Sequence, residues 1–212
     1  MKNFIKLIVV LVVVGLMACS NGTTTPSANL IIDGVIWADT NLNEYQTFAD
    51  RPDMYTNFYQ WNRSTSWPAG GPSPLSGWDS TDITDPAWTV NPCPPGWRLP
   101  TETELDALYE SGSSWAPAGT RGNAVAGDFF GPNHYTASLP DNMDGAIFLP
   151  ASGYVNLYYG TITAQGTQAF YWSSTNYDSA DGWEIGVGSG SMPPGNGGKT
   201  YGYNIRPVRN AK

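Results

Sequence analysis

Glycine and proline interrupt almost every segment of this chain, and they limit what it can fold into. The 212 residues include 24 glycines and 17 prolines. Glycine loses much conformational freedom on folding, and proline lacks the amide hydrogen that helix interiors and central strands need. We therefore expect short elements joined by long loops, and no long helix. With 9 tryptophans and 12 tyrosines, the chain is rich in aromatic residues as well as in loops.

The N-terminus has the pattern of a secreted bacterial protein. Lys2 and Lys6 precede an apolar run that is too short to span a membrane comfortably and that ends in small residues. We interpret residues 1–18 as a signal peptide. The sequence "LMAC" at 16–19 resembles a lipobox, in which cleavage before Cys19 leaves that residue to carry acyl chains. Two or three chains hold a protein at a membrane far better than one, so we predict a lipid-anchored protein of the outer membrane that faces the cell surface or the periplasm.

The segment after the lipobox is polar and small. "SNGTTTPSAN" cannot bury enough apolar surface to fold, and we interpret residues 19–29 as a flexible tether. Residues 30–212 then form the folded part, which is long enough for a single domain with its own core.

The charge balance excludes some partners. Removal of residues 1–18 takes away two lysines and no acids, so Lys plus Arg falls from 10 to 8 against 18 Asp plus Glu, and the formal net charge moves from -8 to -10. Phosphate backbones repel such a protein. We therefore expect no nucleic-acid binding, and membrane contact only through the lipid anchor.

The chain has two cysteines. If Cys19 carries lipid, Cys93 has no intramolecular partner, and no disulfide is expected. Cys93 is a candidate reactive thiol, but its apolar and proline neighbours favour a small buried side chain instead.

A short helix is predicted within "NPCPPGWRLPTETELDAL", residues 91–108. Thr101 and Glu104 form a capping box, in which each side chain accepts a hydrogen bond from the backbone amide of the other residue. Apolar residues then follow on one face, and Ser111-Gly112 ends the helix. The prolines before it fix φ near about −65° and keep the approach extended. We expect a stiff arm that aims the helix.

Side chains around this arm suggest how it is held. Trp97 and Leu99 alternate along it and are expected to fix its inner side in the core. Arg98 and Arg206 stand among apolar neighbours. We expect both arginines to form buried bidentate pairs with carboxylates.

The remaining elements are predicted as strands and loops. Asp33-Gly34 lies between two β-branched runs and predicts a hairpin with a type I′ turn. A long surface loop is expected from residue 63 to residue 90, because no regular period is sustained there. A second loop is expected at 186–198, which is rich in glycine. This stretch lacks the spacing of a phosphate-binding loop and is expected to be flexible. Further short strands are expected at 57–62, 146–155, 169–175, 182–188 and 201–208.

The order of several sequence blocks resembles a known family. These blocks are "DGVIWAD.NL" (33–42), "FYQWNR" (58–63), "NPCPPGWRLPTETELDAL" (91–108), "FLPASGY" (148–154), "YWSST" (171–175) and "YGYNIRPVR" (201–209). Together they are similar to the Fibrobacter succinogenes major paralogous domain over residues 30–209. The resemblance implies a C-type-lectin-like fold of the α+β class, with a twisted antiparallel sheet, one or two short helices and long loops. By analogy alone it suggests a carbohydrate or adhesion role.

Motifs for catalysis are sparse. His134 is the only histidine, and HExxH, GxSxG, CxxC and P-loop motifs do not occur. We expect a protein that is not an enzyme and needs no cofactor, with His134 in a structural or surface role. A glycosidase with paired carboxylates stays open as an alternative, because Glu44, Glu104, Glu184 and the aspartates could be paired by the fold.

The lectin resemblance raises calcium, but the residues do not favour it. "LPDNMDG" (139–145) offers Asp141, Asn142 and Asp144 without the ligand spacing of an EF-hand loop. The EPN, QPD and WND triplets of calcium-dependent lectins do not occur. We interpret the segment as a polar turn and expect no metal site.

Tryptophans on loops are the best candidates for ligand contact. A sugar ring presents an apolar face that a rigid indole can bind at low entropic cost. Trp67, Trp78, Trp88 and Trp115 lie in loop-like segments and are the predicted ligand-contact residues. Their alternative role is to anchor the loops to the core, where we also expect Trp97, Trp172 and Trp183.

These observations predict a non-catalytic, lipid-anchored protein of the cell envelope. Its domain would be a binding or adhesion module for a glycan or for a partner protein at the cell surface. The main alternative is a structural or adhesin-assembly subunit that has no soluble ligand. The carboxylate-pair glycosidase is the third possibility.

Overall fold

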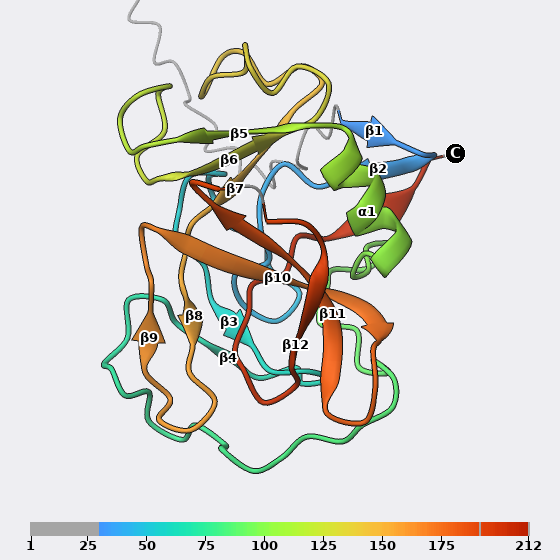
Figure 1. Ribbon diagram of the computed structural model, residues 1–212, viewed down its shortest axis with the longest axis vertical. Helices are drawn as coiled ribbons and strands as arrows, with labels where there is room; N and C mark the ends of the chain where they lie inside the picture. The colour runs from blue at the N-terminus through green and yellow to red at the C-terminus, as the bar shows by residue number, and fades with distance from the viewer. Residues whose placement is uncertain (1–29, 191, 212) are drawn as a thin grey trace, which may run out of the picture.

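The computed structural model describes residues 30–190 and 192–211. The predicted signal peptide, Cys19 and the predicted tether lie outside the described residues. Within the described part, the chain is an α+β protein. Several short antiparallel sheets pack together, and a single helix lies against one side of them (Figure 1). No helix in this part has the length and apolar character needed to cross a membrane.

The strands of the described residues form five antiparallel sheets in place of the one larger sheet that was expected. The first contains β1 (Ile31–Ile32), β2 (Val35–Trp37) and β13 (Val208–Asn210), and the second β3 (Phe58–Tyr59) and β4 (Ser66–Trp67). The third contains β5 (Ser113–Ala116), β6 (Gly127–Phe130) and β7 (Ile147–Pro150), and the fourth β8 (Tyr154–Val155) and β9 (Ile162–Thr163). The longest strands, β10 (Gln168–Asn176) and β11 (Asp181–Gly188), pair with β12 (Gly195–Gly198).

The hairpin expected at Asp33-Gly34 is confirmed. Both residues have positive φ, 47° and 75°, as a type I′ turn requires. Strand β13 pairs with the other edge of β2, with Val208 opposite Trp37. The last strand therefore lies beside the first hairpin and closes the domain (Figure 1).

The predicted helix is confirmed as α1 (Glu102–Glu110), with Thr101 as its N-cap. Thr101 Oγ1 accepts from the Glu104 amide at 3.3 Å, and Glu104 Oε2 accepts from the Thr101 amide at 2.8 Å. The buried face of the helix places Leu105 and Leu108 in one apolar cluster with Ile185. The capping box thus sets where the helix begins, and the apolar face sets how it packs.

The arm before the helix is tied to the end of the chain. Arg98 and Val208 exchange both of their backbone hydrogen bonds, at 2.9 and 2.8 Å. The Arg98 guanidinium also binds Glu104 through two nitrogens, at 2.7 and 2.6 Å, so the expected bidentate pair forms, but the Arg98 side chain is partly exposed and the pair is not buried as expected. Leu99 and Cys93 are buried, and burial raises the pKa of the Cys93 thiol to about 12. Cys93 is therefore a core side chain, as its neighbours indicated.

The prediction of a flexible loop at 186–198 is wrong at both ends of that range, where the residues lie in strands. Residues 186–188 complete β11, and the glycine-rich residues 195–198 form strand β12 on its edge. Gly195 pairs with Glu184 and Gly198 pairs with Asp181. The pairing comes from the hydrogen bonds that β11 offers, which no local propensity of glycine reveals.

Two other expectations hold in part. The segment 63–90 is mostly loop, but it contains β4 and places Leu75 and Ile83 in the core. The segment 201–208 makes isolated bridges at residues 202, 203 and 204, with partners in β8, β3 and β10. It runs between sheets and joins each through one bridge, so it does not become a regular strand before β13.

A buried guanidinium joins these separate parts. Arg206 is 1% exposed, and its Nε donates to Asn41 Oδ1 at 2.7 Å. Its terminal nitrogens donate to the carbonyl oxygens of Ala38 at 2.8 Å and Phe148 at 2.5 Å. The expected bidentate carboxylate partner is thus replaced by an amide and two backbone carbonyls. Burial lowers the pKa of Arg206 to about 10, so the group stays charged at neutral pH.

The hydrogen bonds continue from Asn41. Its Nδ2 donates to Thr56 Oγ1 and to Tyr171 Oη, both at 3.1 Å, and Tyr171 Oη donates to the Pro150 carbonyl at 2.7 Å. Asn204 Nδ2 donates to the Thr56 carbonyl at 3.1 Å. We call Arg206, Asn41, Thr56, Tyr171 and Asn204 the Arg206 network. It connects segments that belong to different sheets.

Replacement of Asn41 by alanine should destabilise the protein strongly. The change leaves the buried Arg206 guanidinium without one of its acceptors, and it removes the Asn41 amide that donates to Tyr171 Oη and, together with Asn204, to Thr56 Oγ1. We expect the free energy of unfolding to fall by about 3 kcal/mol, measured by chemical denaturation. The control Asn196→Ala, at an exposed position, should change it by less than about 0.5 kcal/mol. Equal effects of the two substitutions would contradict the role given to the network.

Candidate functional site

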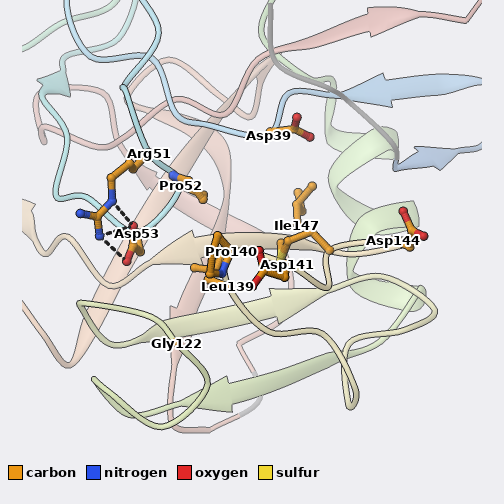
Figure 2. A pocket seen from close by; sticks show the side chains of 11 residues that line it. Asp39, Arg51, Pro52, Asp53, Gly122, Leu139, Pro140, Asp141, Asp144 and Ile147 are labelled. Atoms are coloured by element: carbon orange, nitrogen blue, oxygen red, sulfur yellow. Dashed lines mark hydrogen bonds and ion pairs between the residues drawn. The ribbon is translucent and has the colours of Figure 1, made fainter. Parts of the chain in front are cut away.

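A cleft with acidic and apolar walls opens between the segment 39–53 and the loop that ends at β7 (Figure 2). Its volume is about 730 Å³, within the range of about 300 to 1,000 Å³ that is usual for ligand pockets. Its apolar surface comes from Pro52, Leu139, Pro140, Met143 and Ile147, and its acidic groups are Asp39, Asp53, Asp141 and Asp144. We call this the acidic cleft.

An ion pair fixes one wall of the cleft. Asp53 is buried, and its carboxylate accepts from Arg51 Nε at 3.0 Å and from Arg51 Nη2 at 2.8 Å (Figure 2). The Ala124 amide donates to the same carboxylate at 2.7 Å. Burial alone would raise the pKa of Asp53, but these hydrogen bonds outweigh it and hold the pKa below its usual value. Asp53 is therefore ionised at neutral pH and links two distant segments.

Arg121 holds the opposite loop. Its guanidinium donates to Ser114 Oγ at 2.8 Å and to the carbonyl oxygens of His134 and Ala137. It also lies 4.0 Å from the centroid of the Phe129 ring. These contacts fasten the loop 131–139 to the β5–β6 sheet. Because Leu139 continues this loop into the cleft, Arg121 sets the position of the apolar wall.

The segment 139–145 contains turns, and the side chain of its asparagine, Asn142, hydrogen-bonds to the backbone. Asn142 and Ser138 exchange backbone hydrogen bonds, and Asn142 Nδ2 donates to the Thr136 carbonyl at 2.8 Å. Asp141 and Asp144 are exposed at the rim. Within residues 30–190 and 192–211, no three His, Cys, Asp or Glu side chains gather in a way that could hold a metal ion.

The combination of groups defines what the cleft can bind. Exposed carboxylates at the rim attract a positive charge, and the apolar surface between them can cover an alkyl chain. Arg51 is engaged with Asp53, so its charge is already balanced. The acidic cleft is suited to a basic group carried on an apolar stem.

Trp67 and Trp78 lie together, away from this cleft. Their rings are in edge contact with centroids 4.9 Å apart, and Trp67 is buried. Trp78 Nε1 donates to the Leu157 carbonyl at 3.0 Å. Both indoles pack in the cluster that contains Val155.

Trp88 and Trp115 occupy two other places. Trp88 packs against the buried Trp61 with centroids 4.9 Å apart, and its Nε1 donates to the Val90 carbonyl at 2.6 Å. Trp115 lies in β5 and packs against the cluster that includes Leu105. The fold therefore does not gather Trp67, Trp78, Trp88 and Trp115 into one platform, and each makes internal contacts. Ligand contact by these residues stays a prediction.

The other residues that the sequence analysis singled out pack within the domain or make contacts inside it. Trp172 is buried, while Trp97 and Trp183 are half-buried. Glu104 is held by Arg98 and by the N-cap of α1. His134 is buried, and a Cβ atom at Gly112 would lie 2.7 Å from its Nε2, so the imidazole packs directly against the backbone.

The sequence did not point to Arg51, Asp53 or Arg121 as organising residues. The Arg-x-Asp spacing at 51–53 is a local signal from which the ion pair between Arg51 and Asp53 could have been predicted. The bond from Ala124 to Asp53 joins residues 71 positions apart. Only the fold brings those segments together.

Two buried carboxyl groups lie elsewhere in the domain. Burial raises the pKa of Asp128 from 3.8 to about 7, although the Gly188 amide, which donates to it at 3.0 Å, opposes this shift. Burial raises the pKa of Glu184 from 4.5 to about 8. Both groups therefore favour the protonated form in the folded protein.

Stability should fall as the pH rises from about 4 to about 8. Across that range the folded protein binds more protons than the unfolded chain, so each increase in pH favours unfolding. The stability that Asp128 and Glu184 contribute is fully present below the pKa values that these groups have in the unfolded chain. It is lost as the pH rises through their pKa values in the folded protein. Denaturation midpoints at several pH values measure this. Asp128→Asn and Glu184→Gln should each flatten the slope, and an unchanged slope in both variants would show that other groups cause it.

Comparison with models of protein families gives a match over most of the chain. A family model described as the Fibrobacter succinogenes major domain matches residues 18–209. Searches of curated proteins and of solved structures find no match.

Proposed function

The chain belongs to the Fibrobacter succinogenes major domain family, and we propose that it is a non-catalytic, lipid-anchored protein of the cell envelope that binds a partner protein. The proposal includes a C-type-lectin-like fold, which the antiparallel sheets, the short helix and the long loops support. It places the binding surface in the acidic cleft. The partner contributes a basic side chain flanked by apolar residues.

The acidic cleft is the observation that carries this proposal. It combines a volume of about 730 Å³ with the exposed carboxylates of Asp141 and Asp144 at its rim. Both of its walls are fixed, one by the Arg51–Asp53 pair and the other by Arg121. A preformed cleft of this kind loses little entropy when it binds. Complementary charge gives specificity and speeds association.

The lipid anchor rests on the sequence of the first 19 residues. Lys2 and Lys6, the apolar run and "LMAC" support export and acylation at Cys19. The anchor holds the domain at the outer membrane while the cleft stays available. An anchored binding module of this kind needs no catalytic side chains.

Labelling with radioactive or clickable palmitate tests the anchor. Cells that express the wild-type chain should show a labelled protein of the expected size, and Cys19→Ser should abolish the label. Cys93→Ser is the matched control and should retain it, because Cys93 is a core residue. A label that persists in Cys19→Ser would contradict acylation at this position.

Calorimetry with short peptides tests the cleft. Peptides that carry one lysine or arginine between apolar residues should bind the full chain in detergent, whereas glutamate-containing counterparts should not. The double variant Asp141→Asn/Asp144→Asn should weaken binding by up to about tenfold, since each exposed charge is worth at most about 1 kcal/mol. Added salt should weaken binding as well.

The control makes the same change of charge elsewhere. Asp106→Asn/Glu110→Gln alters exposed acids of α1 and should leave peptide affinity unchanged. Binding that falls equally in both double variants would reflect overall charge and would count against the cleft. If no basic peptide binds, while crosslinking in cells captures one fixed neighbour, the alternative of a structural or adhesin-assembly subunit would be favoured.

A further inference from the structure

Aromatic rings line a second, smaller pocket next to β12. Phe170 and Tyr203 have ring centroids 5.1 Å apart, and Tyr201 and Tyr203 are stacked at 5.7 Å with an interplanar angle of 18°. Tyr154 meets Phe170 edge-on at 5.4 Å. The pocket has a volume of about 320 Å³. We call this the tyrosine pocket.

The tyrosine rings pack directly against glycines of β12. A Cβ atom at Gly197 would lie 2.5 Å from Tyr203 Oη, and one at Gly198 would lie 3.2 Å from Tyr201 Cδ2. Side chains at these positions would therefore push the tyrosines away. The glycine-rich sequence of β12 lets the rings approach the backbone and so sets the shape of the pocket.

A buried carboxyl group completes the pocket. Glu184 is 7% exposed and lines the tyrosine pocket from β11. Its Oε2 has no hydrogen-bond partner among the described residues. A buried polar atom without a partner is costly, so a ligand that supplies a hydrogen bond gains affinity there. Asp181 and Asn196 add polar groups to the lining.

We propose that the tyrosine pocket binds a single neutral saccharide ring, with its apolar face against the tyrosine rings and a hydroxyl group on Glu184. The site is separate from the acidic cleft and does not depend on the function proposed for that cleft. Its volume is at the lower end of the range for ligand pockets, which suits one ring better than an extended chain. The carboxylate of Asp181 disfavours an anionic sugar.

The protonation of Glu184 fits a hydroxyl ligand. Its pKa of about 8 keeps the carboxyl group neutral at pH 7. A neutral carboxyl group can donate one hydrogen bond and accept others, as a sugar hydroxyl also can. No charge then has to be desolvated when the ring enters.

Titration of the full chain in detergent with a sugar panel tests the site. We use D-xylose, D-glucose, D-galactose, D-mannose and N-acetyl-D-glucosamine at millimolar concentrations, followed by NMR of tryptophan and tyrosine ring signals. At least one sugar should shift the Tyr201 signals. Tyr201→Ala should weaken that binding about tenfold or more, because it removes the stacking surface.

Three variants separate binding from folding. Tyr135→Ala removes an exposed tyrosine outside the pocket and should leave sugar affinity unchanged. Glu184→Gln keeps the shape of the side chain and a neutral group that donates and accepts hydrogen bonds, so it should fold and retain sugar binding at pH 7. Gly197→Ala should displace the Tyr203 ring, which its Cβ atom would meet at 2.5 Å, and so weaken sugar binding. Absence of binding to every sugar, or equal affinity in Tyr201→Ala and wild type, would overturn the proposal, whatever the peptide experiments on the acidic cleft show.

Discussion

A buried positive charge organises this domain. Arg206 lies near the end of the chain, yet its hydrogen bonds reach Ala38, Asn41 and Phe148, which are 168, 165 and 58 residues away. A guanidinium group out of contact with water is costly unless its donors are matched. Its planar fork can be matched only when three segments lie at fixed positions. Apolar clusters also pack the sheets together, and the Arg206 guanidinium adds the requirement that these three segments meet at fixed positions.

Both candidate sites take their geometry from this network. Asp39 and Ile147 of the acidic cleft are the chain neighbours of Ala38 and Phe148, whose carbonyl oxygens bind Arg206. Tyr203 of the tyrosine pocket precedes Asn204, which binds the Thr56 carbonyl. A shift in the network would therefore move the walls of the cleft and of the pocket. We infer that the domain holds its sites by buried hydrogen bonds between sheets and not by the stiffness of any one sheet.

Local signals in the sequence predicted local structure. The capping box at Thr101 and Glu104 and the turn at Asp33-Gly34 involve residues a few positions apart, and both form as expected. Strand β12 could not be predicted, because glycines acquire their extended pairing from β11. The neutral acceptors of Arg206 and the contact of Asp53 with Ala124 were hidden as well, since both join distant parts of the chain. The cleft and the tyrosine pocket arise from such long-range contacts, so their residues have no shared sequence motif.

Native-state hydrogen exchange tests the central claim most directly. The amides of Leu42, Tyr59 and Trp172 donate to Ile205, Tyr203 and Asn204, and so report on three segments that meet at the network. If the Arg206 network joins the sheets into one unit, all three amides should exchange only through global unfolding and give the same free energy of opening. A clearly lower free energy for one amide, with the other two still protected, would show that its segment opens independently and would contradict the account.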